Sequence, residues 1–433
     1  MAKGETTGKR RRQDGAARTG RQDGARKGAL ALLAGVREGA SLGEQAPRLD
    51  HLPPGERARA TRLAAEVLRY RGRADALIAR HTNRRPRPDI ADILRLATVE
   101  MRALGAAPHG AVNVAVDLVR GLGPKGRAAA GMVNAVLRKT AGDPGWDELP
   151  PQHLPDWLRA PVAAAWGDEA TKAIEAAHQA GAPLDLTLKP GATPPEGAES
   201  LPTGSARMPV GAQVSALQGY DQGDWWVQDA AAAMAVRMLE PQPGERIVDL
   251  CAAPGGKTMQ LAAAGAQVTA VDSSADRMER VAENLARTQL QATLITADAL
   301  AWQPEHSLDA ILLDAPCSAT GTIRRHPDLP FIRDGEGIAS IIELQGRLLD
   351  RALEILSPGG RLVYATCSLL PAEGEDQIAA ALNRHPGLVV ERPDMQGVDP
   401  AWWTLHGLRL RPDYWPDRQG MDGFFIARLR KPA

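Results

Sequence analysis

Cysteine is scarce in this chain of 433 residues, which contains only Cys251, Cys317 and Cys367. Three thiols cannot form the disulfide framework of a secreted domain, and their scarcity favours a reducing compartment. The sequence also lacks the Cys-x-x-Cys pairs and His clusters that predict zinc sites, so we expect no metal. No apolar run of about 18 residues is present, and we therefore expect a cytoplasmic protein without a membrane-spanning segment.

The chain has no net charge, but its charges are unevenly distributed. Residues 1–27 contain nine Lys or Arg against three acidic residues, so this segment has a net charge of +6 and the remainder has −6. Its composition predicts a disordered basic arm that would be attracted to phosphate groups. Two interpretations stay open, a solubility tail and an RNA-binding arm.

Three regions follow the arm. Apolar residues recur at three- and four-residue spacing over residues 28–142, which predicts an all-α domain. Residues 143–222 are expected to form a small linking subdomain, within which residues 192–212 are predicted to be irregular and partly exposed. Three tryptophans are expected to anchor the core of the linking subdomain: Trp146, Trp157 and Trp166.

Residues 223–433 alternate between strand and helix patterns. The predicted strands are Arg246–Leu250, Val268–Val271, Ala292–Thr296, Leu308–Leu313 and Arg361–Ala365, and the predicted helices are Thr258–Ala264, Asp276–Ala286 and Ile338–Leu356. This alternation predicts an α/β, Rossmann-like domain with a mainly parallel sheet, which binds ligands at the carboxyl ends of its strands. A last strand, Gly423–Leu429, is expected to be antiparallel at the sheet edge.

The first three predicted strands end in groups suited to an adenosine ligand. The first runs into Asp-Leu-Cys-Ala-Ala-Pro-Gly-Gly-Lys-Thr at Asp249–Thr258, where Cys251 replaces the glycine of a Walker phosphate loop. This turn of small residues lets a ligand approach the backbone. Asp272 ends the second strand and can accept hydrogen bonds from ribose hydroxyls, and Asp298 follows the third and can accept one from an adenine amino group.

Cys317 and Cys367 follow the fourth and fifth predicted strands, so both are expected at the same edge. A single buried cysteine is usually a small hydrophobic residue, but two at one ligand-binding edge suggest chemistry. A thiolate that adds to carbon 6 of cytosine makes carbon 5 nucleophilic towards a sulfonium methyl group, and a second thiol can assist the later loss of the carbon-5 proton. Asp314 is placed to contact ring nitrogen 3. The residues alone leave the order of the two thiols open.

These motifs resemble those of the Sun (Fmu) family of RNA cytosine-5 methyltransferases, particularly its branch that acts on small-subunit ribosomal RNA. The resemblance covers about residues 28–430. The motifs that support it most strongly are Asp249–Thr258, Asp314-Ala315-Pro316-Cys317-Ser318 and Thr366-Cys367-Ser368. It implies that Cys367 is the nucleophile, that Cys317 assists product release, and that S-adenosylmethionine is the cofactor. It also makes Asp314 and Lys257 candidate catalytic residues. The predicted cofactor contacts are Cys251, Ala252, Ala253, Pro254, Gly255, Gly256, Lys257, Asp272, Arg277, Asp298 and Asp314.

The helical region resembles a NusB-like RNA-binding domain through Pro108–Asn113 and Val133–Lys139. The resemblance implies that the partner is RNA, and we expect a monomer. The chain departs from the family pattern at Glu373-Gly374, where Glu-Asn is usual, and at Ala319, where glycine is common. Two alternatives stay open: a transfer-RNA cytosine-5 methyltransferase, and a NusB-like RNA-binding or antitermination factor whose methyltransferase half is not catalytic.

Overall fold

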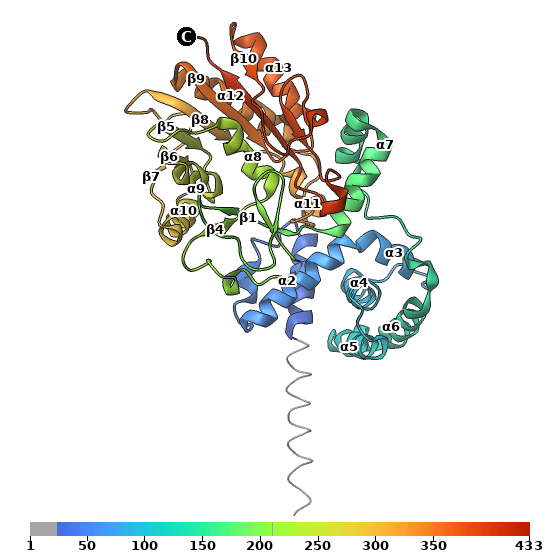
Figure 1. The fold of residues 1–433 in the computed structure, drawn as a ribbon. Coiled ribbons are helices and arrows are strands. Elements are labelled where there is room, and N and C mark those ends of the chain that lie inside the picture. Colours follow the sequence, from blue (N-terminus) through green and yellow to red (C-terminus); the bar gives the residue numbers. More distant parts are fainter. Residues whose placement is uncertain (1–23, 210) are drawn as a thin grey trace, which may run out of the picture. The chain divides into compact units, whose positions relative to one another are not determined.

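The computed structural model describes residues 24–209 and 211–433. Two compact units are present (Figure 1): one comprises residues up to 159 together with 326–334, and the other comprises residues 160–325 and 335–433. The predicted basic arm, residues 1–27, lies outside the described residues except for its last four, which belong to a helix over residues 24–37. No helix in the described part of the chain is long and apolar enough to cross a membrane.

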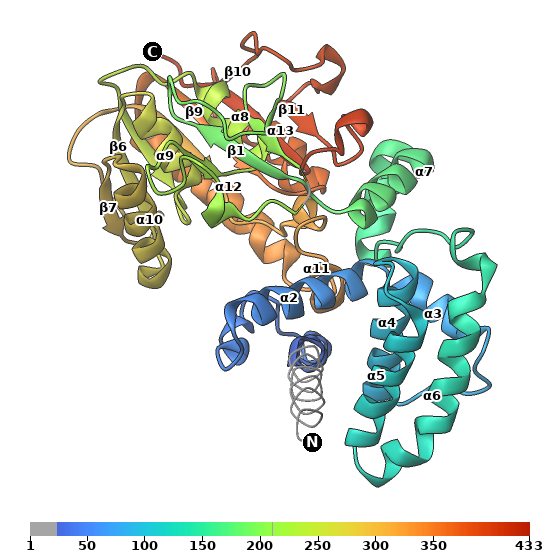
Figure 2. The ribbon, with the colours of Figure 1, turned by 60° about the horizontal axis from the view of Figure 1, so that its bottom comes forward.

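The first unit is all-α, as the apolar spacing predicts. After the helix over residues 24–37 come α2 (Pro54–Arg69), α3 (Arg71–Ala79), α4 (Pro88–Arg102), α5 (Pro108–Gly121) and α6 (Pro124–Gly142). Four of these helices begin with proline, whose fixed φ suits the first helical position and whose missing N–H costs nothing there. Figure 2 shows α4, α5 and α6 running alongside one another, and their apolar faces enclose a core that includes Leu94, Val119 and Leu137.

The segment 326–334 adds a short helix, α11 (Leu329–Ile332), to this all-α unit. The Phe331 ring lies under the Arg71 guanidinium, whose carbon is 4.7 Å from the ring centroid. The Asp328 carboxylate accepts a hydrogen bond from the Leu42 backbone N–H at 2.8 Å.

The linking region differs from the prediction. Helix α7 (Asp156–Ala180) contains a break at Gly167, where φ is +83°. A four-stranded antiparallel sheet then forms in the order β2 (Glu199–Ser200), β3 (Ala206–Met208), β1 (Leu184–Leu188) and β4 (Trp225–Val227). The expectation of an irregular, partly exposed stretch over residues 192–212 was wrong for β3, whose three residues are all buried. Trp146 is buried in the core of the all-α unit and not in the linking subdomain, and Trp157 and Trp166 are only partly buried, so these tryptophans do not anchor the core as expected.

The second sheet is the Rossmann-like sheet that the strand–helix alternation predicts. Its strands are β5 (Arg246–Leu250), β6 (Gln267–Asp272), β7 (Thr293–Thr296), β8 (Leu308–Asp314), β9 (Leu356–Thr366), β10 (Val389–Glu391), β11 (Leu408–Leu410) and β12 (Phe424–Arg430). The strand order is β10-β12-β9-β8-β5-β6-β7, with β11 paired to β12. Strands β5 to β9 are parallel, and β12 is antiparallel to β9 as predicted. The expectation that this last strand forms the sheet edge was wrong, because β12 lies between β9 and β10.

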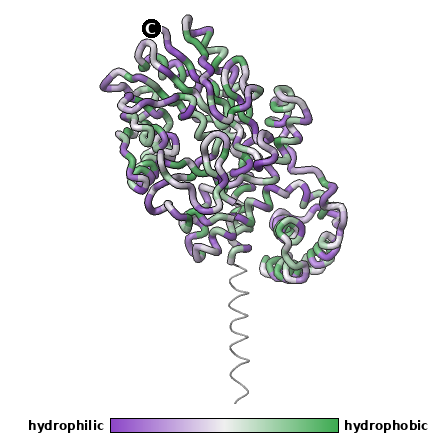
Figure 3. Tube along the Cα trace, in the orientation of Figure 1, coloured by the Kyte–Doolittle hydropathy of each residue, from purple (hydrophilic) through white to green (hydrophobic). Residues whose placement is uncertain are grey.

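Helices cover both faces of this sheet: α8 (Ala230–Leu239), α9 (Gly256–Ala263), α10 (Ala275–Thr288), α12 (Ile338–Ile355) and α13 (Glu375–Arg384). Alternate residues of the strands face opposite sides, so Ile311 packs in one apolar core with α12, and Leu312 packs in the other with α8. The hydropathy colours of Figure 3 follow this arrangement, with hydrophobic stretches along the central strands. Because both faces are filled, a ligand of this sheet binds at the carboxyl ends of the strands.

Candidate active site

The turn after β5 is shaped by residues that adopt unusual backbone conformations. Cys251 has φ +62° and Gly255 has φ +97°. A Cβ atom at Gly255 would lie 3.0 Å from a Val281 side-chain carbon, so only glycine fits between this turn and α10 without strain. The tight turn brings the start of α9 to the sheet edge, where the first N–H groups of the helix have no intrahelical partner.

Asp272, at the end of β6, holds this turn in place. Its Oδ2 accepts the Ala253 N–H at 3.1 Å, and its Oδ1 accepts the Ser274 N–H at 3.0 Å. Arg277 donates from Nη2 to the Ala253 carbonyl at 2.7 Å. Asp298, beyond the end of β7, is exposed, and its Oδ1 accepts the Leu300 N–H at 2.9 Å. The structure thus brings Asp272 and Arg277 onto the turn and leaves Asp298 at the same edge two strands from β5.

Acidic groups gather around Cys251. Burial and the neighbouring carboxylates of Asp314, Asp272 and Asp249 raise the pKa of the Cys251 thiol to about 12. Burial also raises the pKa of Asp249 to about 7, although its Oδ2 accepts a hydrogen bond from Thr258 at 2.6 Å. The Asp249 Oδ1 is buried and has no hydrogen-bond partner among the described residues. These surroundings favour a cation, and they fit the sulfonium and ammonium groups of S-adenosylmethionine.

Asp314, at the end of β8, forms an ion pair with Lys257 on α9. The Lys257 Nζ lies 2.6 Å from Asp314 Oδ2 and 5.5 Å from the centroid of the Phe424 ring. Burial alone would lower the pKa of Lys257, but the Asp314 carboxylate outweighs burial and raises it. Lys257 therefore stays protonated at neutral pH, and this pair places both a positive and a negative group beside the turn.

The two predicted cysteines face each other. The Sγ atoms of Cys317 and Cys367 are 3.4 Å apart, and both cysteines are free thiols. The loop after β8 stays close to Cys367, because the Gly321 N–H donates to the Cys367 carbonyl at 2.9 Å. The contact with the Cys317 thiol and burial raise the pKa of Cys367 well above its ordinary value, and nearby Lys257 opposes this only in part. Cys367 is therefore a protonated thiol at neutral pH.

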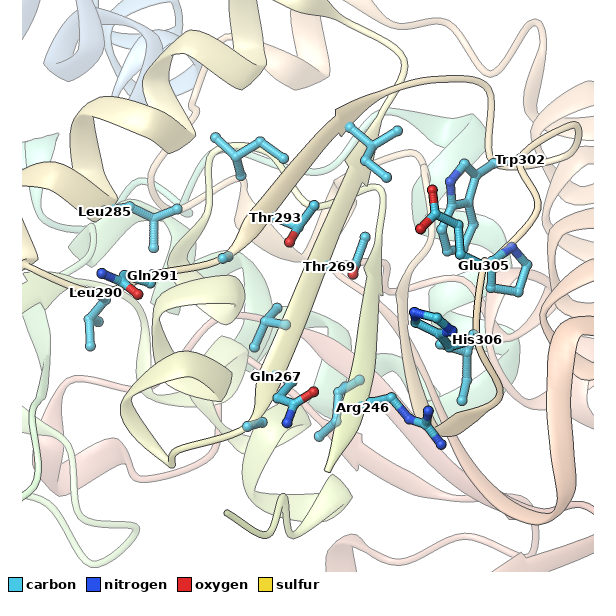
Figure 4. A pocket seen from close by; sticks show the side chains of 18 of the residues that line it. Arg246, Gln267, Thr269, Leu285, Leu290, Gln291, Thr293, Trp302, Glu305 and His306 are labelled. Atoms are coloured by element: carbon cyan, nitrogen blue, oxygen red, sulfur yellow. The ribbon is translucent and has the colours of Figure 1, made fainter. Parts of the chain in front are cut away.

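A groove elsewhere on this unit is not part of the site. It has a volume of about 930 Å³ and lies beside β5, β6 and β7 (Figure 4), where Arg246 and Gln267 begin their strands. Trp302 and His306, from the connection before β8, line its other side. None of the predicted cofactor or catalytic residues lines this groove.

The parallel sheet with an antiparallel neighbour, the glycine turn after β5 and the acids at successive strand ends define a class I S-adenosylmethionine-dependent methyltransferase. Comparisons with known proteins narrow this class. Residues 236–430 match the family described as 16S rRNA methyltransferase RsmB/F, and residues 23–142 match the NusB family. The chain belongs to the RsmB/F methyltransferase family and has a NusB domain at its N-terminal side.

Full-length relatives support this assignment. The ribosomal RNA small subunit methyltransferase B of Xanthomonas campestris pv. campestris is 34% identical over 88% of this chain and 90% of that protein. The protein of the same name from Pseudomonas syringae pv. tomato is 36% identical over 94% and 97% of the two chains. Among solved structures, that of PH0851 has a TM-score of 0.69 and 25% identity over 94% of this chain and 98% of its own.

Three features of the site have no counterpart in the sequence prediction. From the sequence, Asp249 was noted only as the first residue of the motif Asp249–Thr258, although an acidic residue inside an apolar strand can itself indicate a functional site. Phe424 lies over Lys257 from the distant strand β12, which no local pattern reveals. Glu373 lies in the short 3₁₀ helix η5 (Pro371–Glu373), and the sequence marked it only as half of a family dipeptide.

Proposed function

We propose that this protein methylates carbon 5 of a cytosine in small-subunit ribosomal RNA through a covalent adduct with Cys367. The observation that supports this most strongly is the pair of thiols, 3.4 Å apart, beside the Lys257–Asp314 ion pair at the cofactor edge. The relatives' names supply the substrate class, and the NusB domain supplies a second RNA-binding part. We propose that the protein acts as a monomer in the cytoplasm and needs no metal.

The proposed cofactor contacts are the turn Cys251–Lys257, Asp272 for the ribose hydroxyls, and Asp298 for the adenine amino group, with Arg277 and Asp314 beside them. Bound S-adenosylmethionine supplies an electrophilic methyl group on a positively charged sulfur. The carboxylates around Cys251 stabilise that charge. They also keep Cys251 protonated, so this third thiol does not compete as a nucleophile.

The addition step begins when Cys367 loses its proton to solvent and its sulfur bonds to carbon 6 of cytosine. Electrons of the carbon 5–carbon 6 double bond then move toward ring nitrogen 3, where negative charge develops. The Lys257 ammonium stabilises this charge, and the Asp314 carboxylate is proposed to hold the ring at nitrogen 3 by accepting a hydrogen bond from the adjacent amino group of the base. Carbon 5 thereby becomes nucleophilic and takes the methyl group.

The release step needs the proton on carbon 5 to leave. Cys317, whose sulfur lies 3.4 Å from that of Cys367, is proposed to assist its removal. The electron pair of the broken carbon 5–hydrogen bond restores the double bond, and the carbon 6–sulfur bond breaks. Cys367 leaves as a thiolate and takes up the proton that Cys317 helped to remove from carbon 5.

We predict that the rate of methyl transfer rises with pH. Only the thiolate attacks, and the contact with Cys317 and burial raise the pKa of Cys367, so the thiolate fraction is small at neutral pH. Below the pKa, this fraction grows about tenfold per pH unit. Single-turnover rates with saturating RNA and cofactor should therefore rise steadily from about pH 7 to pH 9. A rate independent of pH over this range would contradict a protonated resting nucleophile.

We predict that Asp298→Ala weakens cofactor binding more than it slows methyl transfer by saturated enzyme. The loss of one hydrogen bond to the adenine amino group costs about 1–2 kcal/mol, or roughly 5- to 30-fold in Kd. Calorimetric titration with S-adenosylmethionine measures this. Asp309→Ala is a matched control, because Asp309 is also exposed and accepts one backbone hydrogen bond, from the Arg246 N–H at 2.8 Å. Equal affinities of the two variants would count against the role of Asp298.

The substrate is tested directly by mapping 5-methylcytosine in RNA treated with the purified protein. Small-subunit ribosomal RNA and transfer RNA are offered separately, each with and without S-adenosylmethionine. The proposal expects 5-methylcytosine in the ribosomal RNA only. Modification of the transfer RNA alone would mean that transfer RNA, and not ribosomal RNA, is the substrate. No 5-methylcytosine in either RNA would contradict cytosine-5 chemistry.

A further inference from the structure

The two thiol loops meet at one buried carboxylate, that of Glu373, which has no exposed surface. From the Cys317 loop, Ser318 donates its backbone N–H to Glu373 Oε1 at 2.8 Å and its hydroxyl to Oε2 at 2.5 Å. From the Cys367 loop, Ser368 donates its hydroxyl to the same Oε2 at 2.5 Å. Each cysteine is therefore followed directly by a serine bonded to Glu373, and the carboxylate joins the two loops.

Gln345, on α12, completes this arrangement. Its Nε2 donates to the Pro316 carbonyl at 2.9 Å and to Glu373 Oε1 at 3.0 Å. The peptide group before Cys317 is thus held by Gln345, and the one after it is held by Glu373. The Cys317 backbone is fixed on both sides, independently of its own thiol.

The carboxylate is held by neutral donors only. The four donors supply two hydrogen bonds to each oxygen, and within residues 24–209 and 211–433 no ion pair involves Glu373. An ionised carboxylate accepts hydrogen bonds and donates none, so it suits four inward-facing donors. The Glu373 carbonyl in turn accepts the hydroxyls of Tyr364 and Thr366 at 2.9 and 3.1 Å, which fixes η5 against β9.

We propose that Glu373 is a positioning residue that sets the distance between the two thiols and so allows addition at one and proton removal at the other. This inference rests on the proposed roles of Cys317 and Cys367. Glu373 does not contact the sulfur atoms in any hydrogen bond of the described residues, so it acts through Ser318 and Ser368. Its loss separates the loops, and the Cys317 thiol then no longer contacts the Cys367 thiol.

The test compares three variants of the full chain. Glu373→Gln keeps the side-chain shape but replaces one acceptor oxygen with a donor. Gln345→Met keeps the volume and removes the two hydrogen bonds that Gln345 Nε2 donates, together with the one that its Oε1 accepts from Gln377 at 3.4 Å. Glu245→Gln is the matched control, because Glu245 pairs with Arg361 at 2.6 Å at the opposite end of the strands, away from the thiols. Two quantities are measured: alkylation of Cys367 by iodoacetamide against pH, located by peptide mass spectrometry, and the single-turnover rate at which methylated RNA is released from the protein.

We expect both Glu373→Gln and Gln345→Met to be alkylated at Cys367 at lower pH than the wild type, because the contact with Cys317 that raises its pKa is loosened. We also expect release of the methylated RNA to slow by about tenfold or more, because Cys317 is proposed to assist that step, while KM for RNA and Kd for cofactor stay within about twofold. Glu245→Gln should match the wild type in both measurements. If Glu373→Gln does not fold, Gln345→Met alone decides between the two outcomes.

A wild-type alkylation profile, or a wild-type rate, in the folded variants overturns the proposal. A fall in rate without a change in alkylation also overturns it, because the carboxylate would then act by another route. The alkylation measurement needs neither RNA nor cofactor. It therefore reports on the thiol distance even if Cys367→Ala proves active and the proposed function itself fails.

Discussion

Replacement of Cys367 by alanine is expected to slow methyl transfer by on the order of a thousandfold or more while leaving cofactor affinity nearly unchanged. Without the sulfur, no adduct forms at carbon 6, and carbon 5 of cytosine remains too weak a nucleophile to take the methyl group. Cofactor affinity is preserved because Cys367 follows β9, whereas the proposed cofactor contacts follow β5, β6 and β7 or lie at the end of β8. Incorporation of labelled methyl groups into RNA and calorimetric titration of the cofactor provide the two measurements.

Cys367→Ser is the matched variant, since its hydroxyl preserves a small polar side chain at this position. We expect it to be as inactive as Cys367→Ala, because an unactivated hydroxyl is a far weaker nucleophile than a thiolate. Retention of more than about a few per cent of wild-type activity by Cys367→Ala would remove Cys367 from the mechanism.

Replacement of Cys317 by alanine is expected to have the opposite outcome: enzyme that stays covalently bound to its RNA. The variant can still add to carbon 6 and transfer the methyl group. Loss of the 3.4 Å contact also removes the first cause of the raised pKa of Cys367, so addition should become easier. Elimination stalls, because the group placed to assist removal of the carbon-5 proton is gone.

A denaturing gel of each variant with substrate RNA distinguishes the two cysteines. The account predicts a slowly migrating covalent band with Cys317→Ala and none with Cys367→Ala. The residues alone do not decide which thiol attacks the base and which assists release, so the reverse pattern is also informative. A band with Cys367→Ala and none with Cys317→Ala would exchange the two roles.

The parts of the fold that follow from local periodicity were predictable from the sequence. The strand at Arg246–Leu250 has the predicted bounds, and the predicted acids at 272 and 314 end β6 and β8. A parallel sheet buried on both faces requires continuous apolar strands, which makes such strands visible in a sequence. The position of Cys317 and Cys367 at one edge of the sheet was also predictable, because each cysteine follows the end of a predicted strand and the carboxyl ends of parallel strands meet at the same edge.

What the sequence did not reveal depends on contacts between distant residues. Strands β2 and β3 of the small sheet were not predicted because they have two and three residues, too few for a period-two pattern. The role of Glu373 rests on hydrogen bonds to Ser318, 55 positions away, which neither spacing nor composition shows. The raised pKa of Cys367 likewise arises from the contact with Cys317, 50 positions away, and from burial, neither of which a local sequence pattern shows.

The most direct test of the central claim is to identify the protein atom that bonds to the base. Small-subunit ribosomal RNA that contains 5-fluorocytosine is incubated with the wild-type protein and S-adenosylmethionine, and the digested complex is sequenced by mass spectrometry. Fluorine at carbon 5 cannot leave as a proton does, so the adduct persists after methyl transfer. The account predicts a methylated fluorocytosine attached to the peptide that contains Cys367. Attachment to Cys317, or no covalent complex at all, would contradict it.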